Sequence, residues 1–229
     1  MAKSKRYNDL YKSVDRDVFY TLSDGIGMIR SGSVKFDETV DIAVNLGVDP
    51  RHADQLVRGT VALPNGTGKD VKVLVITQGE NIALAESAGA DLVGSDEYIS
   101  KIKGGWVGVD TIIVTPDMMA KVGQLGKILG PKGLMPSPKS GTVTADVVRA
   151  VKEIKSGRIE YRVDKQGIVH SVLGRVGFGS DKLLENALVF MSAIKSARPS
   201  SVKGTYLKKV TISSTMGPGI KIDVNSIAS

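Results

Sequence analysis

The sequence predicts an α/β protein of two domains: a discontinuous α+β domain built from both chain ends, with a Rossmann-like parallel α/β domain inserted between them. Three observations predict this fold class. The middle of the chain alternates β-branched runs with helical segments, as in a parallel sheet covered by helices. Both flanks carry strands that alternate apolar and polar residues, as in a sheet with one wet face. Glycine-rich linkers separate the two styles, so we expect one domain at 1–67 and 159–229 and the other at 68–158.

The N-terminal flank contains two expected strands. In residues 38–46 the apolar side chains Val40, Ile42, Val44 and Leu46 recur with the period of two that places them on one face of a sheet. Residues 57–63 form the second expected strand.

The middle region predicts strands and helices in alternation. Gly89 suits the C-terminal cap of a helix, the Ser95 hydroxyl suits an N-cap, and Pro116 suits the first turn of a helix. The expected strands are 71–77, 90–93 and 111–114, and the expected helices are 80–88, 95–103, 116–121 and 144–155.

The C-terminal flank returns to the half-buried pattern. Residues 159–163 and 168–172 flank the turn at 164–167 and predict a hairpin. A helix follows from 180 to about 197, capped by Ser180 or Asp181. Residues 208–214 and 219–224 form the last two expected strands.

Two short connections join the expected domains side by side, an arrangement typical of a hinge. The residues that we expect to form it are glycines and their small or rigid neighbours. They are Pro64, Gly66, Gly68, Ser156 and Gly157.

The composition limits the function. The chain has no cysteine, and His52 and His170 lie far apart in no ligand-spaced cluster, so we expect no metal and no cofactor. The basic N-terminus lacks the apolar core of a signal peptide and no run approaches transmembrane length, so we expect a cytoplasmic protein without a membrane partner. A net charge of +7 and a pI near 9.5 favour a polyanionic partner such as nucleic acid.

One segment resembles a phosphate-binding loop but lacks two of the residues that the motif requires. Residues 65–70 end in Gly-Lys, but Leu63 stands where the motif needs its first glycine and Asp70 stands where it needs Ser or Thr. No nucleophile or acid–base set accompanies it. We therefore expect no catalytic residues and reject the alternative of a nucleotide-dependent enzyme.

Residues 126–141 form a Gly/Pro-rich segment, which predicts an ordered irregular loop without helix or strand. Its lysines, Lys127, Lys132 and Lys139, lie in a stretch from 118 to 145 that has no acidic residue. A contact with a polyanion is one interpretation, and a solvated connecting loop is the other.

The domain built from the chain ends is the more basic, with a net charge of +5 (19 basic and 14 acidic residues) against +2 (12 and 10) for the inserted one. Residues 186–222 contain six basic residues and no acidic one. The turn at 213–219 offers hydroxyls and glycine-exposed amides, which bond RNA phosphates and ribose hydroxyls. A turn that only reverses the chain is the alternative.

Two ring side chains have both a structural and an RNA-binding interpretation. Phe36 beside Lys35 either packs in the core or stacks on a base. His170 lies in an expected strand and either has a structural role or meets RNA at the strand surface.

Four segments together resemble the L-one family of large-subunit ribosomal proteins in its bacterial form, from Tyr20 to Val224. They read GKILGPKGLMPSPKSGTV, VRGTVALPNGTGK, VKFDETVDIAVNLG and KKVTISSTMGPGIKI. The resemblance implies that the discontinuous domain binds ribosomal RNA and that the protein resides on the mobile stalk, near the tRNA exit site. It also implies help in the movement and release of deacylated tRNA, repression of its own operon by binding the messenger RNA, and a monomer when free of the ribosome.

The RNA-binding residues implied by this resemblance fall in two groups. The first group consists of Lys35, Phe36, Thr39, Thr215, Met216, Gly217 and Pro218. The second, near the expected hairpin, consists of Lys165, His170 and Arg175. Lys209 stands where some relatives carry a small hydroxyl residue, so that contact is expected to differ.

Overall fold

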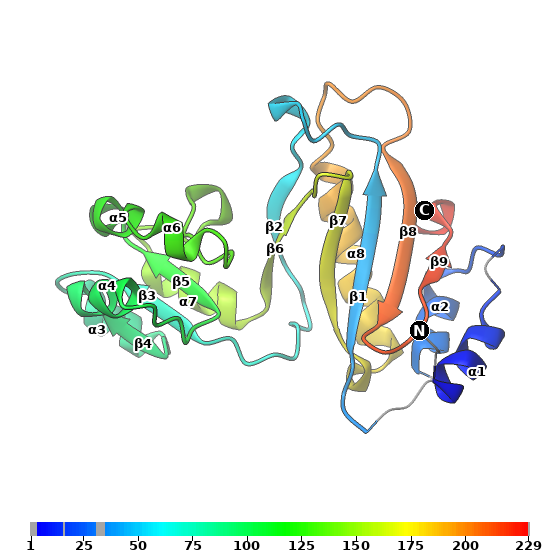
Figure 1. The fold of residues 1–229 in the computed structure, drawn as a ribbon, viewed down its shortest axis with the longest axis horizontal. Helices are drawn as coiled ribbons and strands as arrows, with labels where there is room; N and C mark the ends of the chain where they lie inside the picture. The colour runs from blue at the N-terminus through cyan, green and yellow to red at the C-terminus, as the bar shows by residue number, and fades with distance from the viewer. Residues whose placement is uncertain (1–3, 16, 31–34, 229) are drawn as a thin grey trace. The chain divides into compact units, whose positions relative to one another are not determined.

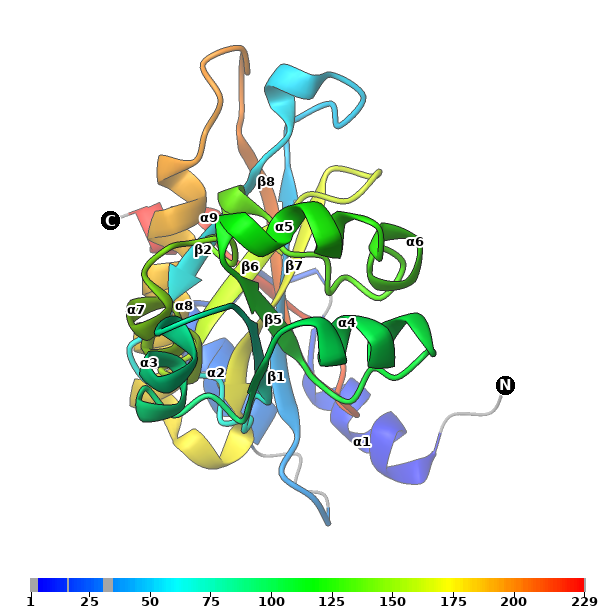
Figure 2. The same ribbon diagram turned by 90° about the vertical axis from the view of Figure 1, so that its left-hand side faces the viewer.

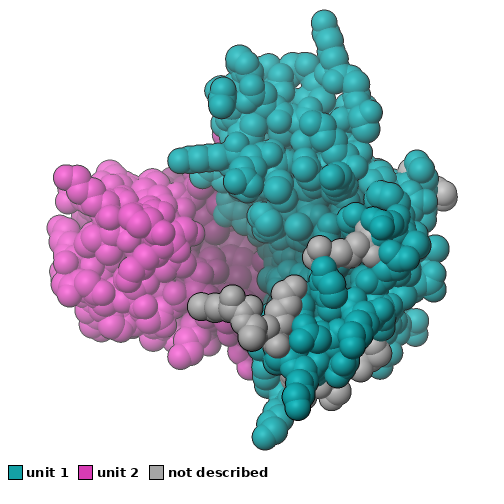
Figure 3. Space-filling view, turned by 45° about the vertical axis from the view of Figure 1, so that its right-hand side comes forward, with its two compact units in different colours: residues 1–68, 159–229 teal, residues 69–158 magenta. Residues whose placement is uncertain are grey.

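The computed structural model describes residues 4–15, 17–30 and 35–228, which divide into two compact units. Unit 1 comprises residues 1–68 and 159–229, and unit 2 comprises residues 69–158 (Figure 3). The predicted α/β class is confirmed, because unit 1 contains an antiparallel sheet and unit 2 a parallel sheet flanked by helices.

Unit 1 is built on a four-stranded antiparallel sheet in the order β7-β1-β8-β9 (Figure 1). Its strands are β1 (Thr39–Leu46), β7 (Ile168–Arg175), β8 (Leu207–Ser214) and β9 (Ile220–Ile222). The central strand β1 comes from the N-terminal part of the chain, and its neighbours β7 and β8 come from the C-terminal part.

The alternation predicted for β1 is present. Val40, Ile42, Val44 and Leu46 are buried, and the residues between them are half-buried. Helices α2 (Leu22–Arg30) and α8 (Ser180–Ser196) pack on this apolar face. The opposite face carries the polar side chains of the sheet.

The rest of unit 1 consists of a second, two-stranded sheet and short helices. They are β2 (Arg58–Ala62), β6 (Arg158–Arg162), α1 (Lys5–Ser13), α9 (Val224–Ala228) and the 3-10 turns η1 (Ala53–Gln55) and η3 (Val176–Phe178).

Helices α1 and α2 were not predicted from the sequence. Gly25 and Gly27 lower the helix propensity of α2, so packing must stabilise it. A Cβ added at Gly25 would lie 2.6 Å from the Ile222 side chain, which shows how closely α2 approaches the sheet. Gly25 therefore has two effects: it permits the close packing that stabilises α2, and it makes the sequence of α2 look like a loop.

Unit 2 contains a parallel sheet in the order β4-β3-β5 between two layers of helices (Figure 2). Its elements are β3 (Val73–Ile76), α3 (Asn81–Ser87), β4 (Leu92–Gly94), α4 (Asp96–Lys103), β5 (Thr111–Val114), α5 (Pro116–Gly123), α6 (Gly126–Leu129), η2 (Pro138–Ser140) and α7 (Val147–Lys155). Leu74 and Ile76 of β3 pack with α4, α5 and α6, whereas Val73 and Val75 pack with α3 and α7. All four are fully buried, as the β-branched run predicted.

Two of the predicted helix caps are confirmed and two are wrong. Gly89 follows α3 with a φ of +90°, and Pro116 begins α5. The Ser95 side chain makes no capping hydrogen bond to α4. Helix α8 begins at Ser180 directly after Gly179, so neither Ser180 nor Asp181 is its cap.

The expectation of a wholly irregular segment at 126–141 is also wrong. Its first residues form α6, because Leu129 and the preceding Leu125 are one helical turn apart and both pack in the core of unit 2. Residues 138–140 form η2, which ends at Gly141 with a φ of +67°. Only the residues between these two turns are irregular.

A buried amide on α8 ties three backbone segments of unit 1 together. The Asn186 side chain is fully buried and accepts a hydrogen bond from the Asn65 N–H at 3.1 Å. Its Nδ2 donates to the carbonyls of Gly66 at 3.0 Å and Leu173 at 2.7 Å. Asn186 thus fixes the start of the connection to unit 2 against β7.

Asn186→Ala should destabilise unit 1 by about 2–4 kcal/mol, because one buried and two part-buried backbone groups lose their partner. Amide exchange of β1 reports on unit 1, and the fluorescence of the single tryptophan, Trp106, reports on unit 2. Protection of β1 should fall while the Trp106 transition stays in place. The matched control is Ser192→Ala, an exposed polar-to-alanine change on the same helix, and equal protection of β1 in both variants would contradict the prediction.

Candidate nucleic-acid interface

The turn that follows β8 is hydrogen-bonded to the start of β1. The Thr215 N–H donates to the Thr39 carbonyl at 3.0 Å, and the Thr39 N–H donates to the Thr215 hydroxyl at 3.1 Å. These bonds continue the β1–β8 ladder by one residue pair beyond Val40 and Ser214. Two segments that are 176 residues apart in the chain therefore form one surface.

The turn itself has a defined geometry. The Met216 N–H donates to the buried carboxylate of Glu38 at 3.1 Å, and the Gly217 N–H donates to the Ser214 carbonyl at 3.2 Å. A Cβ at Gly217 would lie 2.5 Å from the Ser214 hydroxyl, so the turn closes most easily with glycine at this position.

Two large apolar side chains project from this fixed backbone into solvent. Phe36 is 53% exposed and Met216 is 51% exposed. Exposed apolar groups are common singly, but Met216 lies in the hydrogen-bonded turn and Phe36 lies in the segment that leads into its partner Thr39. The core-packing interpretation of Phe36 is therefore wrong.

The end of β7 joins the same surface. Arg175 donates to the Asp37 carbonyl at 2.9 Å, the Val176 N–H donates to the Glu38 carbonyl at 2.9 Å, and the Gly177 N–H donates to the Asp37 carboxylate at 2.9 Å. Residues 37–39 are thus held between the ends of β7 and β8.

The predicted residues are gathered in part. Of the first group, Thr39, Thr215 and Met216 belong to the hydrogen-bonded turn and the start of β1, and Arg175 is bonded to Asp37 beside them. Gly217 and Pro218 follow in the turn, and Lys35 and Phe36 precede Thr39 in the chain. Lys165 lies elsewhere, in the turn before β7, and His170 lies along β7 opposite Ala43.

The open face of the sheet connects these two places. The strand register aligns His170, Ala43, Thr211 and Lys221 in one row across β7, β1, β8 and β9. His170 and Lys221 are exposed. The His170 Nε2 lies 3.8 Å from an Asp164 carboxylate oxygen, and backbone N–H groups, chiefly that of Ile168, lower the pKa of Asp164.

Asp41 opposes the cationic character of this face. Burial raises the pKa of the Asp41 carboxyl, and His170 lowers it in part. A carboxylate here disfavours a phosphate backbone, so the row is a less favourable RNA surface than the turn.

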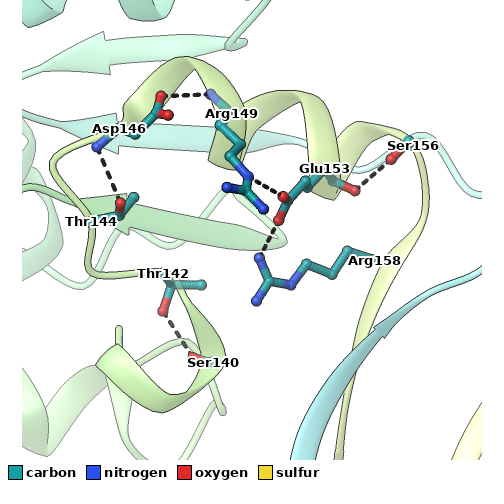
Figure 4. Close-up of polar contacts among 8 residues, drawn as sticks. All are labelled: Ser140, Thr142, Thr144, Asp146, Arg149, Glu153, Ser156 and Arg158. Atoms are coloured by element: carbon teal, nitrogen blue, oxygen red, sulfur yellow. Dashed lines mark hydrogen bonds and ion pairs between the residues drawn. The ribbon is translucent and has the colours of Figure 1, made fainter. Parts of the chain in front are cut away.

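The three lysines of the Gly/Pro segment lie in unit 2. Lys127, Lys132 and Lys139 are exposed, and none of them forms an ion pair with a described residue. The segment continues into the polar contacts drawn in Figure 4, where Glu153 accepts from both Arg149 at 2.7 Å and Arg158 at 2.5 Å. The cations of the segment are thus available to a ligand, whereas the arginines near it are paired.

Two residues of the interface were not predicted from the sequence. Glu38 is only 2% exposed, and Arg6 of α1 contacts both Glu38 and Met216. The sequence shows only that Glu38 is a charged residue next to a half-buried strand, which does not predict its burial. The contact of Arg6 spans 210 residues and has no local signature.

Within the described ranges, no group of three or more His, Asp or Glu side chains is placed to hold a metal ion. No helix of the described chain has both the length and the apolar character needed to cross a membrane.

The chain matches the model of a protein family. The model of the ribosomal protein L1p/L10e family matches residues 28–218, which is most of the chain. The matched range includes unit 2 and the segments around Phe36 and Thr215, and it begins after α1.

Asp41→Asn should stabilise the protein at pH 7. Because burial raises the folded-state pKa above the usual 3.8, the folded state binds more protons between the two pKa values, and stability falls as the pH rises through that interval. The variant should therefore have the higher thermal midpoint at pH 7, and its advantage should shrink as the pH approaches 3.8. Asp9→Asn, at an exposed position of α1, is the charge-matched control. A midpoint at pH 7 no higher than that of wild type would contradict the prediction.

Proposed function

The chain belongs to the ribosomal protein L1p/L10e family, and we propose that it binds ribosomal RNA through the surface where β1, β7 and β8 end near Thr39 and Thr215. The family consists of RNA-binding proteins of the large ribosomal subunit and is not an enzyme family. The observation that carries the proposal is the exposure of Phe36 and Met216 beside a turn whose backbone is fixed by hydrogen bonds.

The chemistry of this surface suits RNA with unpaired bases. The Phe36 ring offers a face on which a base can stack, and Met216 offers a second apolar contact. The Thr215 hydroxyl donates its proton to the Thr39 carbonyl at 3.3 Å, so this oxygen and the carbonyls of the turn can accept hydrogen bonds from ribose hydroxyls. Lys35 adds a cation for a phosphate. Arg175, His170 and Lys165 extend the proposed surface along β7 and its turn.

We further propose the roles implied by the bacterial form of the family. The protein would reside on the mobile stalk near the exit site, assist the movement and release of deacylated tRNA, and repress its own operon by binding the messenger RNA. Both RNAs would use the same surface of unit 1, and the free protein would be a monomer. Lys127, Lys132 and Lys139 would form a second, weaker contact with tRNA or neighbouring RNA.

The proposed hinge comprises the connections at Pro64, Gly66 and Gly68 and at Ser156 and Gly157. Gly66, Gly68 and Gly157 have positive φ values, which other residues rarely adopt. Such positions can absorb large changes of φ and ψ when the units reorient.

Phe36→Ala should weaken binding of stalk RNA about tenfold or more, because loss of one stacked base costs about 1–3 kcal/mol. Thr215→Ala should weaken it by a similar factor, because the turn loses the hydroxyl that accepts the Thr39 N–H at 3.1 Å and donates to the Thr39 carbonyl at 3.3 Å. Single alanine changes at Lys127, Lys132 or Lys139 should cost less, and the triple change should also spare stalk RNA. Filter-binding titrations at fixed salt measure this, with Phe19→Ala as the matched control because Phe19 is 58% exposed in the same unit.

Two results would contradict this assignment. Equal affinity of the wild type for stalk RNA and for scrambled RNA of the same length would exclude specific recognition. A large loss of stalk-RNA affinity in the triple lysine variant would exclude the proposed division between the two units.

Repression predicts competition between two RNAs for one surface. Unlabelled leader messenger RNA should displace labelled stalk RNA, and Phe36→Ala should weaken both complexes by a similar factor. Simultaneous binding of both RNAs, seen as a supershifted complex in a gel, would refute a shared surface.

A further inference from the structure

Helix α1 is tied directly to the turn of the proposed RNA surface. The Arg6 Nη2 donates to the Met216 carbonyl at 3.1 Å, and its Nη1 lies 3.7 Å from a carboxylate oxygen of Glu38. The other Glu38 oxygen accepts the Met216 N–H at 3.1 Å. Arg6 and Glu38 therefore hold both polar groups of the Met216 residue, one on each side; we call these three residues the Met216 clamp.

Burial makes the clamp sensitive to the loss of Arg6. The Glu38 side chain is 2% exposed, and its oxygen facing Arg6 has no hydrogen-bond partner among the described residues. A buried carboxylate is costly unless a positive group offsets its charge. Arg6 supplies that charge while remaining 33% exposed itself.

The remainder of α1 supports this geometry. The Ser4 hydroxyl caps the helix by accepting the Tyr7 N–H at 3.2 Å, and the rings of Tyr7 and Tyr11 stack at a centroid distance of 5.9 Å. Leu10, Ser13 and Val14 line a small cavity together with the turn residues Gly217 and Pro218. The end of α1 and the turn therefore face the same cavity, in addition to the direct contact through Arg6.

We propose that Arg6 is a positioning residue for RNA recognition. It fixes the Met216 peptide and offsets the Glu38 carboxylate, so that the turn presents its RNA-binding groups in one conformation before RNA arrives. This inference rests on the proposed RNA surface. A preorganised surface binds more tightly because less conformational entropy is lost on association.

The test separates positioning from a direct phosphate contact. Arg6→Ala should weaken binding of stalk RNA about tenfold, as expected for the loss of a charged hydrogen bond. The slope of log K against log salt should stay at the wild-type value, because no phosphate contact is lost. In the free variant, amide hydrogen exchange of the peptide 212–219 should accelerate.

Two further variants complete the design. Lys12→Ala removes the same charge from an exposed position of the same helix and should leave the exchange of the turn unchanged. Arg6→Lys keeps a charge opposite Glu38 but lacks the fork that reaches two partners, so it should restore only part of the affinity. Should Arg6→Ala fail to fold, Arg6→Lys carries the same three measurements.

Three outcomes would overturn the positioning role. They are wild-type affinity in Arg6→Ala, a salt slope reduced by about one, and unaltered exchange of the turn. Failure of the proposed function looks different, because wild-type protein would then bind stalk and scrambled RNA alike. In that case unaltered exchange in Arg6→Ala would still refute the clamp, since the exchange measurement uses no RNA.

Discussion

The antiparallel pairing of β1 with β7 and β8 is the constraint on which the proposed RNA surface depends. Both neighbours follow unit 2 in the sequence, so the sheet forms only when strands from before and after the inserted residues pair with each other. The register follows from burial, because a slip of one residue would turn Val40 and Ile42 toward solvent and polar residues into the core. Hydrophobic packing of β1 thus places Thr39 opposite Thr215.

The same pairing explains how apolar side chains remain exposed at the surface. Burial stabilises most large apolar groups by about 25 cal/mol per Å² of area, and Phe36 and Met216 forgo much of this. The Met216 backbone is instead held by hydrogen bonds to Glu38 and Arg6, and residues 37–39, which follow Phe36, are bonded to Thr215 and to the end of β7. A surface whose position does not depend on its own burial can exchange solvent for a ligand without rearranging.

The sequence predicted most elements that have a clear period and missed those that depend on tertiary contact. The alternation of β1 and the β-branched run of β3 identify their strands directly. Helix α2 was missed because it contains two glycines, of which Gly25 packs closely against Ile222 of β9, far away in the chain. Ser95 was expected to cap α4 from residue type alone, but type does not determine whether the hydroxyl faces the helix end.

The interface was likewise predicted only in part. The family resemblance indicated Phe36 and residues 215–218 as RNA-binding, whereas the residues themselves were equally consistent with core packing and a simple turn. The exposure of Phe36 excludes core packing, but this exposure could not be predicted without knowing which side chains cover the sheet. Glu38 and Arg6 could not be predicted, because they contact Met216 across 178 and 210 residues of sequence, Glu38 from directly before β1 and Arg6 from α1.

The connections between the units are held tightly on both sides of a short span. Asn186 fixes Gly66 to unit 1, and Asp110 accepts from Lys69 and from the Lys72 N–H within unit 2. Gly68, with a φ of +70°, lies between these points, and a Cβ there would approach the Phe178 ring to 2.7 Å. Glycine is therefore favoured at Gly68 for its conformation and for its size. Because the flanking residues are fixed, a proposed reorientation of the units along this connection would have to be absorbed by the few bonds around Gly68 and not by a long flexible linker.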